Sequence, residues 1–383
     1  MLRNSICIAS GGDVTVPCGG TNRVTAFIKG LRDNGFDVHL ISPMFEKEEF
    51  LEDLKDVKIH TVAIKKTESV NNRLVRALSI SLKAKKIVKN NNAILEIEHS
   101  TLAGFATLVG CSDFILDMHD LCFMSPVDTK LVFSRIVQRL IYTMEKRAVT
   151  RASKIIVVSN PMKEFIMKEW NVPEGKIEVI PNGYFESKLN NFNFEDVKEV
   201  DGMISFLGTL HPKLDLDKII ELAKSLDTSR IYIIGDGHGR DELKKKIKKH
   251  NLNNVVLTGR LPDREAFKLL AKSQVVILPE YPSLETEASC PVKLFDYAAL
   301  GKAIVADDVA EMCRIFKENN AALVSDSSDH EKFIDNVRIL LGDEDLRREL
   351  GENAKKLVKG FTWDGQAEKL VKMYKEILYT CDL

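Results

Sequence analysis

The densest group of reactive side chains lies in residues 279–302, directly after the apolar run 275–278. The predicted loop in this segment carries three glutamates, Glu280, Glu285 and Glu287. A predicted helix follows, with Lys293 and Asp296 three residues apart and therefore on one helical face. A solvated acidic loop with a simple ion pair is the alternative, but it does not explain the apolar residues around these charges. We therefore predict a binding site in this segment.

Two histidines stand at the ends of apolar runs in the first half of the chain. His99 follows the run 93–97, and His119 follows the run 114–118. The carboxyl ends of parallel strands meet at one edge of a sheet, where such proteins bind ligands. A lone histidine is more often structural, yet these two fall at adjacent strand ends. We favour a functional role for His119, and both interpretations stay open for His99.

Glycine-rich loops follow several predicted strands. Gly19 and Gly20 open a predicted helix, where free backbone amides favour an anion, although a plain turn explains the same residues. The loop 235–239 has the spacing G-x-G-x-G instead of the G-x-G-x-x-G of dinucleotide-binding proteins. About twenty residues further on, where an acid should bind the ribose, the chain is apolar. A nicotinamide-dependent dehydrogenase is therefore disfavoured.

Two aspartate pairs, Asp215 with Asp217 and Asp343 with Asp345, have the spacing of a metal–diphosphate motif. Each pair stands at the start of a predicted helix, where Asp caps free amides and complements the helix dipole. We favour capping, and we predict no metal site and no metal cofactor.

Short apolar runs alternate with longer amphipathic stretches along almost the whole chain. Before residue 180 the predicted strands are 6–10, 37–41, 57–64, 93–97, 114–118 and 154–158, with helices at 21–34, 72–89 and 131–151. After residue 200 the predicted strands are 203–207, 231–234, 255–258, 275–278, 303–306 and 321–324, with helices at 217–226, 240–250 and 264–271, and two helices at the end of the chain. This alternation predicts α/β domains with parallel sheets covered on both faces.

The alternation breaks near 180–183, and residues 190–199 are polar and irregular, which indicates a linker. A chain of 383 residues is long enough for two domains. We predict a first domain at 1–183, joined by a C-terminal helix at 365–383, and a second domain at 200–362. Both are expected to be doubly wound and to face one another across a ligand-binding cleft.

The charge balance limits the partners, because 55 basic and 56 acidic residues leave a net charge of −1. A general nucleic-acid binder usually carries a clear basic excess, so we predict no nucleic-acid partner. No apolar run approaches the ~18–20 residues that a membrane-spanning helix needs. The seven cysteines are scattered without a C-x-x-C pair, which favours a reducing cytoplasm over a disulfide framework.

Several segments resemble the GT-B glycosyltransferases of family 4, group 1. Residues 17–20 and the segment G-F-D-V-H-L-I at 35–41 resemble the family's glycine-rich opening, and I-P-N-G at 180–183 matches its interdomain connection. Successive loops of its second domain match the loops that contain Gly208, Gly235 and Gly259. Residues 289–302, S-C-P-V-K-L-F-D-Y with a following G-K, match its donor-binding helix.

The resemblance implies roles for individual residues. Asp296 falls where the family's second glutamate binds the nucleotide ribose, and Gly259 and Arg260 fall near the base. His119 is expected near the sugar carbon that is attacked. Four further glycines are expected to help bind the donor: Gly19, Gly20, Gly208 and Gly235.

Two positions depart from the family pattern. The family's first glutamate falls on Ala288, so Glu285 or Glu287 is the expected substitute, with main-chain contact to the sugar as the alternative. The arginine expected after Gly208 is a threonine here. We expect Lys213 and Lys293 to neutralise the diphosphate instead.

The resemblance implies a retaining glycosyltransferase that moves a sugar from a nucleotide-diphosphate sugar to an acceptor, either lipid-linked or a cell-surface glycan precursor. Lysines and backbone amides neutralise such a leaving group without a metal. A nucleotide-sugar epimerase of the same fold, or a non-catalytic nucleotide-sugar-binding protein, is the alternative. The donor's base and sugar, the acceptor, the linkage and the oligomeric state stay open.

Residues 65–89 form a basic segment with eight lysines and arginines and a single acid, Glu68. Four apolar residues fall roughly on one stripe of the predicted helix: Leu74, Leu78, Leu82 and Val88. A basic amphipathic helix binds anionic membrane surfaces. Alternatively, the stripe packs on the first sheet and the lysines are merely solvated. We therefore expect a cytoplasmic protein, either with or without peripheral contact to the inner membrane face through this segment.

Overall fold

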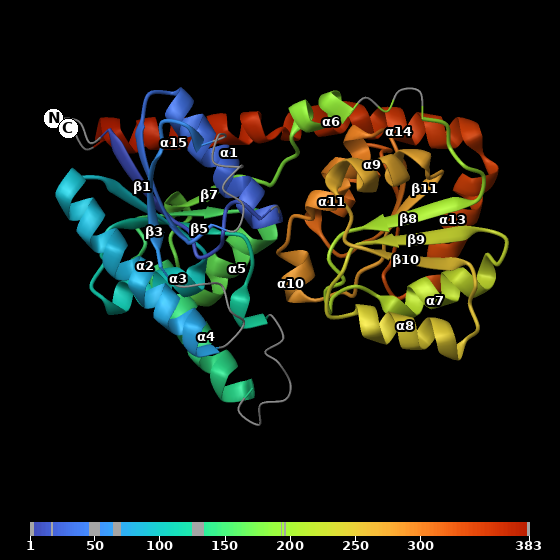
Figure 1. Ribbon diagram of the computed structural model, residues 1–383, viewed down its shortest axis with the longest axis horizontal. Helices are drawn as coiled ribbons and strands as arrows, with labels where there is room; N and C mark the ends of the chain where they lie inside the picture. Colours follow the sequence, from blue (N-terminus) through green and yellow to red (C-terminus); the bar gives the residue numbers. More distant parts are fainter. Residues whose placement is uncertain are drawn as a thin grey trace. The chain divides into compact units, whose positions relative to one another are not determined.

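A computed structural model of the protein describes residues 4–16, 18–45, 54–63, 70–124, 134–192, 194 and 197–380. The chain divides into two compact units, the first formed by Met1–Asn182 with Trp363–Leu383 and the second by Gly183–Thr362. Each unit has its own parallel sheet with helices on both faces (Figure 1). The predicted α/β class with two doubly wound sheets is therefore confirmed.

The first unit has a seven-stranded sheet in the order β3-β2-β1-β4-β5-β6-β7, with every pairing parallel. Its strands are β1 (Ser5–Ala9), β2 (Asp37–Pro43), β3 (Lys58–Val62), β4 (Ile94–Glu98), β5 (Phe114–Met118), β6 (Lys154–Val157) and β7 (Ile177–Val179). Its helices are α1 (Gly19–Asp33), α2 (Val70–Asn91), α3 (Ser100–Leu108), α4 (Ser134–Arg151), α5 (Asn160–Trp170) and α15 (Trp363–Thr380). α1 packs against α15 on one face, and α2, α3 and α4 cover the other (Figure 1).

The second unit has a six-stranded sheet in the order β10-β9-β8-β11-β12-β13, again with every pairing parallel. Its strands are β8 (Met203–Leu207), β9 (Arg230–Ile234), β10 (Val255–Gly259), β11 (Val275–Leu278), β12 (Ala303–Asp307) and β13 (Leu323–Ser325). Its helices are α6 (Glu186–Phe192), α7 (Leu216–Ser225), α8 (Arg240–Lys249), α9 (Asp263–Lys272), α10 (Leu284–Glu287), α11 (Val292–Ala299), α12 (Glu311–Glu318), α13 (His330–Gly342) and α14 (Glu344–Val358). The strand order reverses between β8 and β11, the position at which such sheets bind ligands.

Continuous apolar runs mark the strands most sharply. The predicted strands 114–118, 203–207 and 275–278 are confirmed residue for residue as β5, β8 and β11. Almost every side chain of these strands is buried, because helices cover both faces of each sheet. The other predicted strands and helices are present with ends shifted by a few residues. The start of the predicted helix 131–151 lies outside the described residues.

The alternation pattern does not predict α3, α5 or β7. The local signals for α5 are nevertheless present, since the Ser159 hydroxyl accepts a hydrogen bond from the Met162 amide at 3.2 Å. Pro161 occupies the first turn, and Asn171 ends the helix in the left-handed conformation with φ of 55°. These three residues explain a helix of only 11 residues that its apolar spacing does not reveal.

One expectation about chain connections is wrong, and another holds only in part. In the described part of the chain three α-helices follow β13, not two, because Asp343 leaves the helical conformation and its carboxylate accepts a hydrogen bond from the Leu346 amide at 2.9 Å. This cap ends α13 and starts α14 within one residue. The region read as a linker, 190–199, begins inside α6, and residues 193, 195 and 196 of it lie outside the described residues.

The C-terminal helix α15 belongs to the core of the first unit. A Cβ at Gly30 of α1 would lie 2.5 Å from the Ala367 Cβ, so the two helices approach at a point where only glycine fits. Trp363 packs edge-on against Phe27 with ring centres 6.5 Å apart. Tyr374 is also fully buried. Residues more than 330 positions apart therefore share one hydrophobic core.

Candidate functional site

Three glycines meet at the carboxyl ends of β8, β9 and β10. The Gly208 amide donates to the Ile234 carbonyl at 2.9 Å, and the Gly235 amide donates to the Gly259 carbonyl at 3.0 Å. Gly208 and Gly235 have φ of 145° and 141°, which L side chains rarely adopt. A Cβ at Gly235 would lie 2.0 Å from the Gly208 carbonyl oxygen. The structure therefore brings these predicted residues together, and Gly208 and Gly235 pack backbone against backbone at this edge of the sheet.

Lys293, in the first turn of α11, lies along this edge. Its Nζ is 2.9 Å from Glu280 Oε1 and 5.0 Å from the centre of the Phe206 ring. A Cβ at Gly208 would lie 2.6 Å from Lys293 Cε, so the lysine side chain runs over the glycine. We call Gly208, Lys213, Glu280 and Lys293 the Lys293 cluster. Lys213 belongs to it because its carbonyl accepts a hydrogen bond at 2.8 Å from the amide of the residue after Glu280.

Glu280 is a buried anion between these lysines, with 1% of its surface exposed. Burial raises the pKa of this carboxyl, but the charges of Lys293 and Lys213 outweigh burial and hold the pKa below its usual value. The carboxylate is therefore ionised at neutral pH. Only Oε1 is hydrogen-bonded, since Oε2 is buried without a hydrogen-bond partner among the described residues.

A second buried ion pair lies next to Glu280. Lys218 Nζ is 2.6 Å from Asp307 Oδ1, and neither side chain is exposed. Asp307 Oδ2 accepts a hydrogen bond at 3.0 Å from the Glu280 amide. Burial raises the pKa of Asp307 to about 7, against the opposite effect of Lys218. This pair joins the ends of β11 and β12 to α7 and fixes the backbone that carries Glu280.

The other predicted residues of the second unit are spread around this edge. Glu287 lies on the short helix α10 and pairs with Arg314. Glu285 is half-buried on the same helix, and Asp296 is half-buried on α11 one turn after Lys293. Arg260 is exposed directly after β10. The structure thus gathers Gly208, Lys213 and Lys293, whereas Glu287 is engaged by an arginine.

In the first unit, His119 follows β5 among buried acids. Its Nε2 is 3.0 Å from Asp117 Oδ2, and its Nδ1 is 3.9 Å from Glu98 Oε1. A Cβ at Gly20, in the first turn of α1 after Gly19, would lie 3.3 Å from His119 Nδ1. We call Gly20, Arg23, Glu98, Asp117 and His119 the His119 cluster. The predicted residues Gly20 and His119 are therefore in close contact.

Arg23 neutralises Asp117 from the other side. Its Nε and Nη2 lie 2.9 Å from Oδ2 and 2.8 Å from Oδ1 of Asp117, and both side chains are buried. Burial raises the pKa of Asp117, but Arg23 and His119 outweigh burial and hold it well below its usual range. Arg23 also donates to the Ile180 carbonyl at 2.8 Å. An ionised carboxylate thus holds the His119 ring in one orientation.

A third acid, Glu96 of β4, lies buried near Asp117. It accepts a hydrogen bond from the Tyr374 hydroxyl of α15. Burial, with the charge of Asp117, raises the pKa of Glu96 to about 8. Glu96 is therefore largely protonated at neutral pH, in contrast to Asp117.

His99 belongs to a structural group. Its Nδ1 is 3.0 Å from Cys122 Sγ, and burial with the nearby charge of Glu145 raises the pKa of the Cys122 thiol well above its ordinary value. Glu145 accepts hydrogen bonds from the Ser100 hydroxyl and from the Cys122 amide. These contacts fix the turn after β5, and a protonated thiol is no nucleophile.

Both aspartate pairs cap helices. Asp215 accepts a hydrogen bond from the Lys218 amide at 2.9 Å, and Asp343 caps α14 as described above. The capping prediction is therefore confirmed. Within the described residues, no group of three or more His, Cys, Asp and Glu side chains is placed to hold a metal ion.

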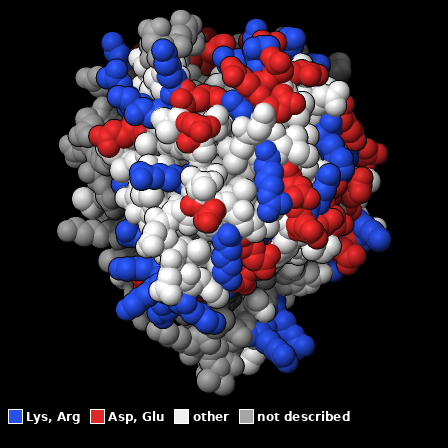
Figure 2. Space-filling view, turned by 90° about the vertical axis from the view of Figure 1, so that its right-hand side faces the viewer, with Lys and Arg blue, Asp and Glu red and all other residues white. Residues whose placement is uncertain are grey.

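The apolar stripe predicted on the basic helix does not pack on the sheet. Leu74, Leu78 and Leu82 of α2 are 43%, 38% and 57% exposed, while Ile80 and Ala84 form the buried face. α2 carries six basic residues and no acid. Lys65, Lys66 and Glu68 lie outside the described residues. On the face of the molecule shown in Figure 2, in contrast to α2, basic and acidic side chains are intermixed.

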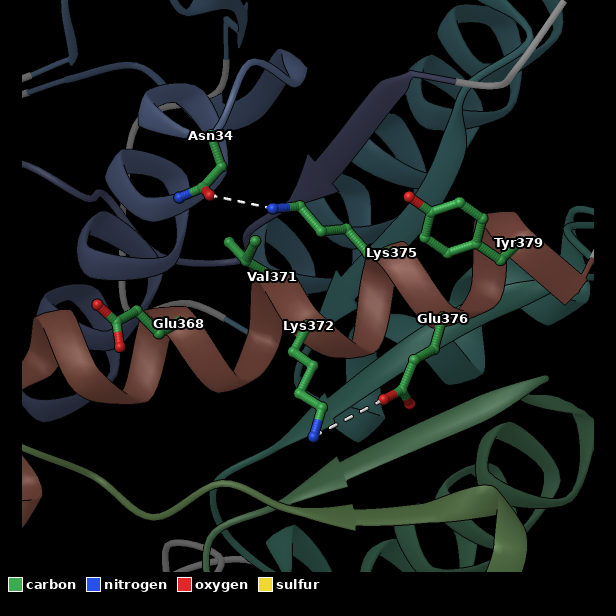
Figure 3. Close-up of a pocket in the computed structure, with 7 residues that line it drawn as sticks. All are labelled: Asn34, Glu368, Val371, Lys372, Lys375, Glu376 and Tyr379. Atoms are coloured by element: carbon green, nitrogen blue, oxygen red, sulfur yellow. Dashed lines mark hydrogen bonds and ion pairs between the residues drawn. The ribbon is translucent and has the colours of Figure 1, made fainter.

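One hollow on the first unit lies where α15 passes the end of α1 (Figure 3). Charged side chains line it, and Lys375 Nζ contacts Asn34 Oδ1 at 3.3 Å while Lys372 lies 4.0 Å from Glu376. None of the predicted site residues lines this hollow. Among the helices of the described chain, none is both long and apolar enough to cross a membrane.

The buried acids that hold Lys293 and His119 were only partly predictable from the sequence. Asp117 had a usable signal, because an acid inside the apolar run 114–118 must find a partner once it is buried. No sequence signal identifies Arg23 as this partner, since it lies 94 residues from Asp117 on a helix of ordinary composition. Glu280 was noticed as a loop acid, but its burial was not foreseen.

Comparison with known proteins assigns the chain to a family. Residues 17–185 match the model of "Glycosyltransferase Family 4", and residues 187–357 match that of "Glycosyl transferases group 1". The chain belongs to the family 4, group 1 glycosyltransferases. It is 26% identical over 368 residues to an uncharacterized glycosyltransferase of Methanocaldococcus jannaschii, covering 94% of this chain and 95% of that protein.

Two further similarities cover most of this group 1 glycosyltransferase. An Escherichia coli UDP-Gal:alpha-D-GlcNAc-diphosphoundecaprenol alpha-1,3-galactosyltransferase is 22% identical over 331 residues, or 80% of this chain and 82% of that protein. The solved structure of sucrose-phosphate synthase from Thermosynechococcus elongatus matches with a TM-score of 0.77 at 15% identity, covering 98% and 99% of the two chains. The fold is therefore GT-B, and the protein is a glycosyltransferase.

Proposed function

We propose that this glycosyltransferase moves a sugar, with retention of its anomeric configuration, from a nucleotide-diphosphate sugar to a glycan or lipid-linked acceptor. The observation that carries the proposal is the Lys293 cluster, in which an ammonium group is held beside a glycine-lined backbone edge. A diphosphate leaving group needs such fixed positive charge where its own charge develops. The name of the E. coli relative, with its UDP-sugar donor and lipid diphosphate acceptor, supports this choice of substrates.

In the proposed mechanism, the second unit binds the donor. Lys293 and Lys213 neutralise the diphosphate without a metal, and the backbone of Gly208 and Gly235 approaches it closely. Asp296 binds the nucleotide ribose, and Arg260 lies near the base, as the family resemblance implies. Glu285 or Glu287 of α10 contacts the sugar in this proposal, and Glu287 also forms an ion pair with Arg314.

The first unit contributes His119 on the acceptor side of the proposed reaction. Asp117 holds the ring through Nε2, and Nδ1 faces Gly20 and Glu98. A histidine fixed in this way positions or exchanges a proton during transfer. The Gly20 backbone leaves the space beside the ring that a side chain would fill.

We further propose that α2 lies against an anionic membrane when the acceptor is lipid-linked. Exposed leucines and six basic residues on one helix match a surface of lipid chains and negative head groups. Each lysine or arginine near such a surface contributes about 1 kcal/mol. Lys83 and Lys85 contact the Thr61 and Val109 carbonyls, so Lys86 and Lys89 are the lysines of choice for a test.

A donor screen followed by turnover tests the transferase proposal. Thermal unfolding is measured with UDP-, GDP- and ADP-sugars, because a ligand of the folded state raises its stability. The donor that stabilises the protein is then incubated with lipid-linked and soluble glycan acceptors, and NMR reads the anomeric configuration of the product. An α-linked donor that yields an α-linked product supports retention. Epimerised sugar without an acceptor indicates an epimerase, and binding without any turnover indicates a non-catalytic protein.

Vesicle co-sedimentation tests the membrane proposal. The wild type should bind anionic but not neutral vesicles at low salt, and the double variant Lys86→Glu/Lys89→Glu should lose this binding. Lys244→Glu/Lys248→Glu is the matched control, since it makes the same charge change on exposed positions of α8 in the second unit. Equal loss in both double variants would indicate net charge, not α2, as the cause.

A further inference from the structure

In the ion pair between Glu280 and Lys293, the acid is buried and the base is partly exposed. Glu280 is 1% exposed, whereas the Lys293 side chain is 19% exposed. The carboxylate oxygen that does not bind Lys293 is itself buried. A ligand at this edge of the sheet therefore meets the lysine and not the glutamate.

The Glu280–Lys293 pair is not expected to contribute much to the stability of the fold. Burying a carboxylate is costly unless its oxygens are satisfied, and a buried ion pair is often no more stabilising than an apolar pair. Glu280 uses one oxygen and leaves Oε2 without a hydrogen bond among the described residues. The Lys218–Asp307 pair nearby is better satisfied, since Asp307 also accepts from the Glu280 amide and Lys218 donates to the Ser327 carbonyl at 2.9 Å.

Glu280 is also fixed in place. Its backbone forms a β-bridge with Leu214 and donates to Asp307, which is itself held by Lys218. Lys293, by contrast, has a long stem that lies over Gly208 and near the Phe206 ring, and its Nζ is hydrogen-bonded to Glu280 at 2.9 Å. The glutamate therefore acts as a fixed anchor and the lysine as the group it holds.

We propose that Glu280 is a positioning residue that fixes the Lys293 ammonium for a diphosphate leaving group. This inference rests on the proposed transferase function. Without Glu280, Lys293 keeps its charge but loses its fixed place beside Gly208. A preorganised charge accelerates a reaction more than a mobile one does, because no reorganisation accompanies the developing charge.

Removal of Glu280 is expected to affect nucleotide binding and sugar transfer in different directions. Glu280 is an anion close to the site of an anionic ligand, so its removal does not weaken diphosphate binding and tends to tighten it. Its removal nevertheless slows transfer. A residue that touched the substrate, or one that only stabilised the fold, would not separate these two effects in this direction.

The test compares Glu280→Gln, Lys293→Met and the double variant with the wild type. Calorimetry gives the affinity for UDP, or for GDP or ADP if the wild type selects these in the donor screen, and steady-state kinetics give kcat and KM. We expect Glu280→Gln to bind the nucleotide at least as tightly as the wild type, with kcat lowered roughly 10–100-fold. The double variant should turn over no more slowly than Lys293→Met alone, because Glu280 acts through Lys293.

Glu199→Gln is the matched control, since it removes another glutamate–lysine pair of the second unit, that of Glu199 with the buried Lys302. Its kcat should equal that of the wild type. Glu280→Asp keeps the charge one methylene away and should restore part of the lost kcat, which also covers the case that Glu280→Gln does not fold. Additive losses in the double variant, or nucleotide affinity lost in Glu280→Gln, would overturn the positioning role. A wild type that binds no nucleotide would instead overturn the proposed function itself.

Discussion

The Lys293 cluster and the His119 cluster both place a basic side chain on a buried carboxylate, but the carboxylates differ in their other partners. Asp117 has Arg23 bound to both of its oxygens, so its charge is matched before His119 is considered. Among the residues that the structure describes, Glu280 uses one oxygen, Oε1, for a hydrogen bond, and its partner is Lys293. The first arrangement orients a ring without depending on it for charge balance. The second makes the acid depend on the charges of Lys293 and Lys213, and it places a cation where an anion is expected to bind.

The largest expected effect comes from removing the cation of the second unit. Lys293→Met should lower kcat by roughly 10²–10³-fold and weaken nucleotide binding, because it removes the charge that faces the leaving group. Kinetics and calorimetry on the purified protein check both numbers. Lys244→Met, on an exposed position of α8, is the control and should match the wild type. Unchanged nucleotide affinity in Lys293→Met would mean that the diphosphate is held elsewhere.

Removing the basic group of the first unit should have a smaller and purely kinetic effect. His119→Ala is expected to lower kcat by roughly 10²-fold, the usual scale for a positioned proton-transfer group, with nucleotide affinity preserved. Lys293→Met is thus expected to change both nucleotide binding and turnover, whereas His119→Ala is expected to change turnover alone. If His119→Ala lowered nucleotide affinity as much as Lys293→Met does, the division of roles between the clusters would be wrong.

The third prediction concerns pH and the two neighbouring acids of the first unit. The pKa of Glu96 in the folded state, about 8, is above its unfolded value of about 4.3. Between these two values the folded protein keeps a proton on Glu96 that the unfolded chain has released. The contribution of Glu96 to the free energy of unfolding is therefore complete below about pH 4.3 and is lost as the pH rises through about 8. Through Glu96, the free energy of unfolding changes by at most about 1.4 kcal/mol per pH unit. Asp117 has the opposite sign, because its lowered pKa gives stability that is lost only in acid.

Urea unfolding at pH 5, 6.5 and 8 measures this difference. The wild type should lose stability across the series, and Glu96→Gln, which cannot ionise there, should lose less. Parallel declines for the two proteins would show that Glu96 does not titrate in this range.

The fold followed from the sequence where one local feature decides the outcome. Continuous apolar runs located β5, β8 and β11, and aspartates before helices located the caps of α7 and α14. Gly208, Gly235 and Gly259 could be grouped because each ends a strand, and strand ends meet at one edge. These inferences need only the chain's local pattern and the rule that parallel strands end together.

The partners within the site could not be predicted in this way. Arg23 meets Asp117 through the register of α1 against β5, which apolar periodicity does not specify. Glu280 is buried because the loop after β8 folds over it, although its own neighbours in sequence are those of an exposed turn. On α2, both Leu74–Leu78–Leu82 and Ile80–Ala84–Ile87 form apolar stripes, and only tertiary packing decides that the second faces the core.

The smallest expected effect compares one glycine from each cluster. A Cβ at Gly20 would lie 3.3 Å from His119 Nδ1 and 3.4 Å from Glu98 Oε1, close enough to shift the ring by a few tenths of an ångström. Gly20 lies in the first turn of α1, where alanine is the better helix former by up to about 1 kcal/mol. We therefore expect Gly20→Ala to keep or raise the melting temperature while kcat falls by less than about tenfold, or 1.4 kcal/mol.

Gly208→Ala should behave differently on both counts. Its φ of 145° is unfavourable for any L side chain, and the new Cβ would lie 2.6 Å from Lys293 Cε. The variant should lower the melting temperature, because strain of this kind destabilises by about 1–3 kcal/mol. It should also displace the lysine and weaken nucleotide binding, which Gly20→Ala leaves intact. Thermal unfolding and calorimetry on the two variants check this contrast. Equal effects of the two substitutions would mean that the glycines serve only backbone geometry, and that neither is placed to leave room for the side chain beside it.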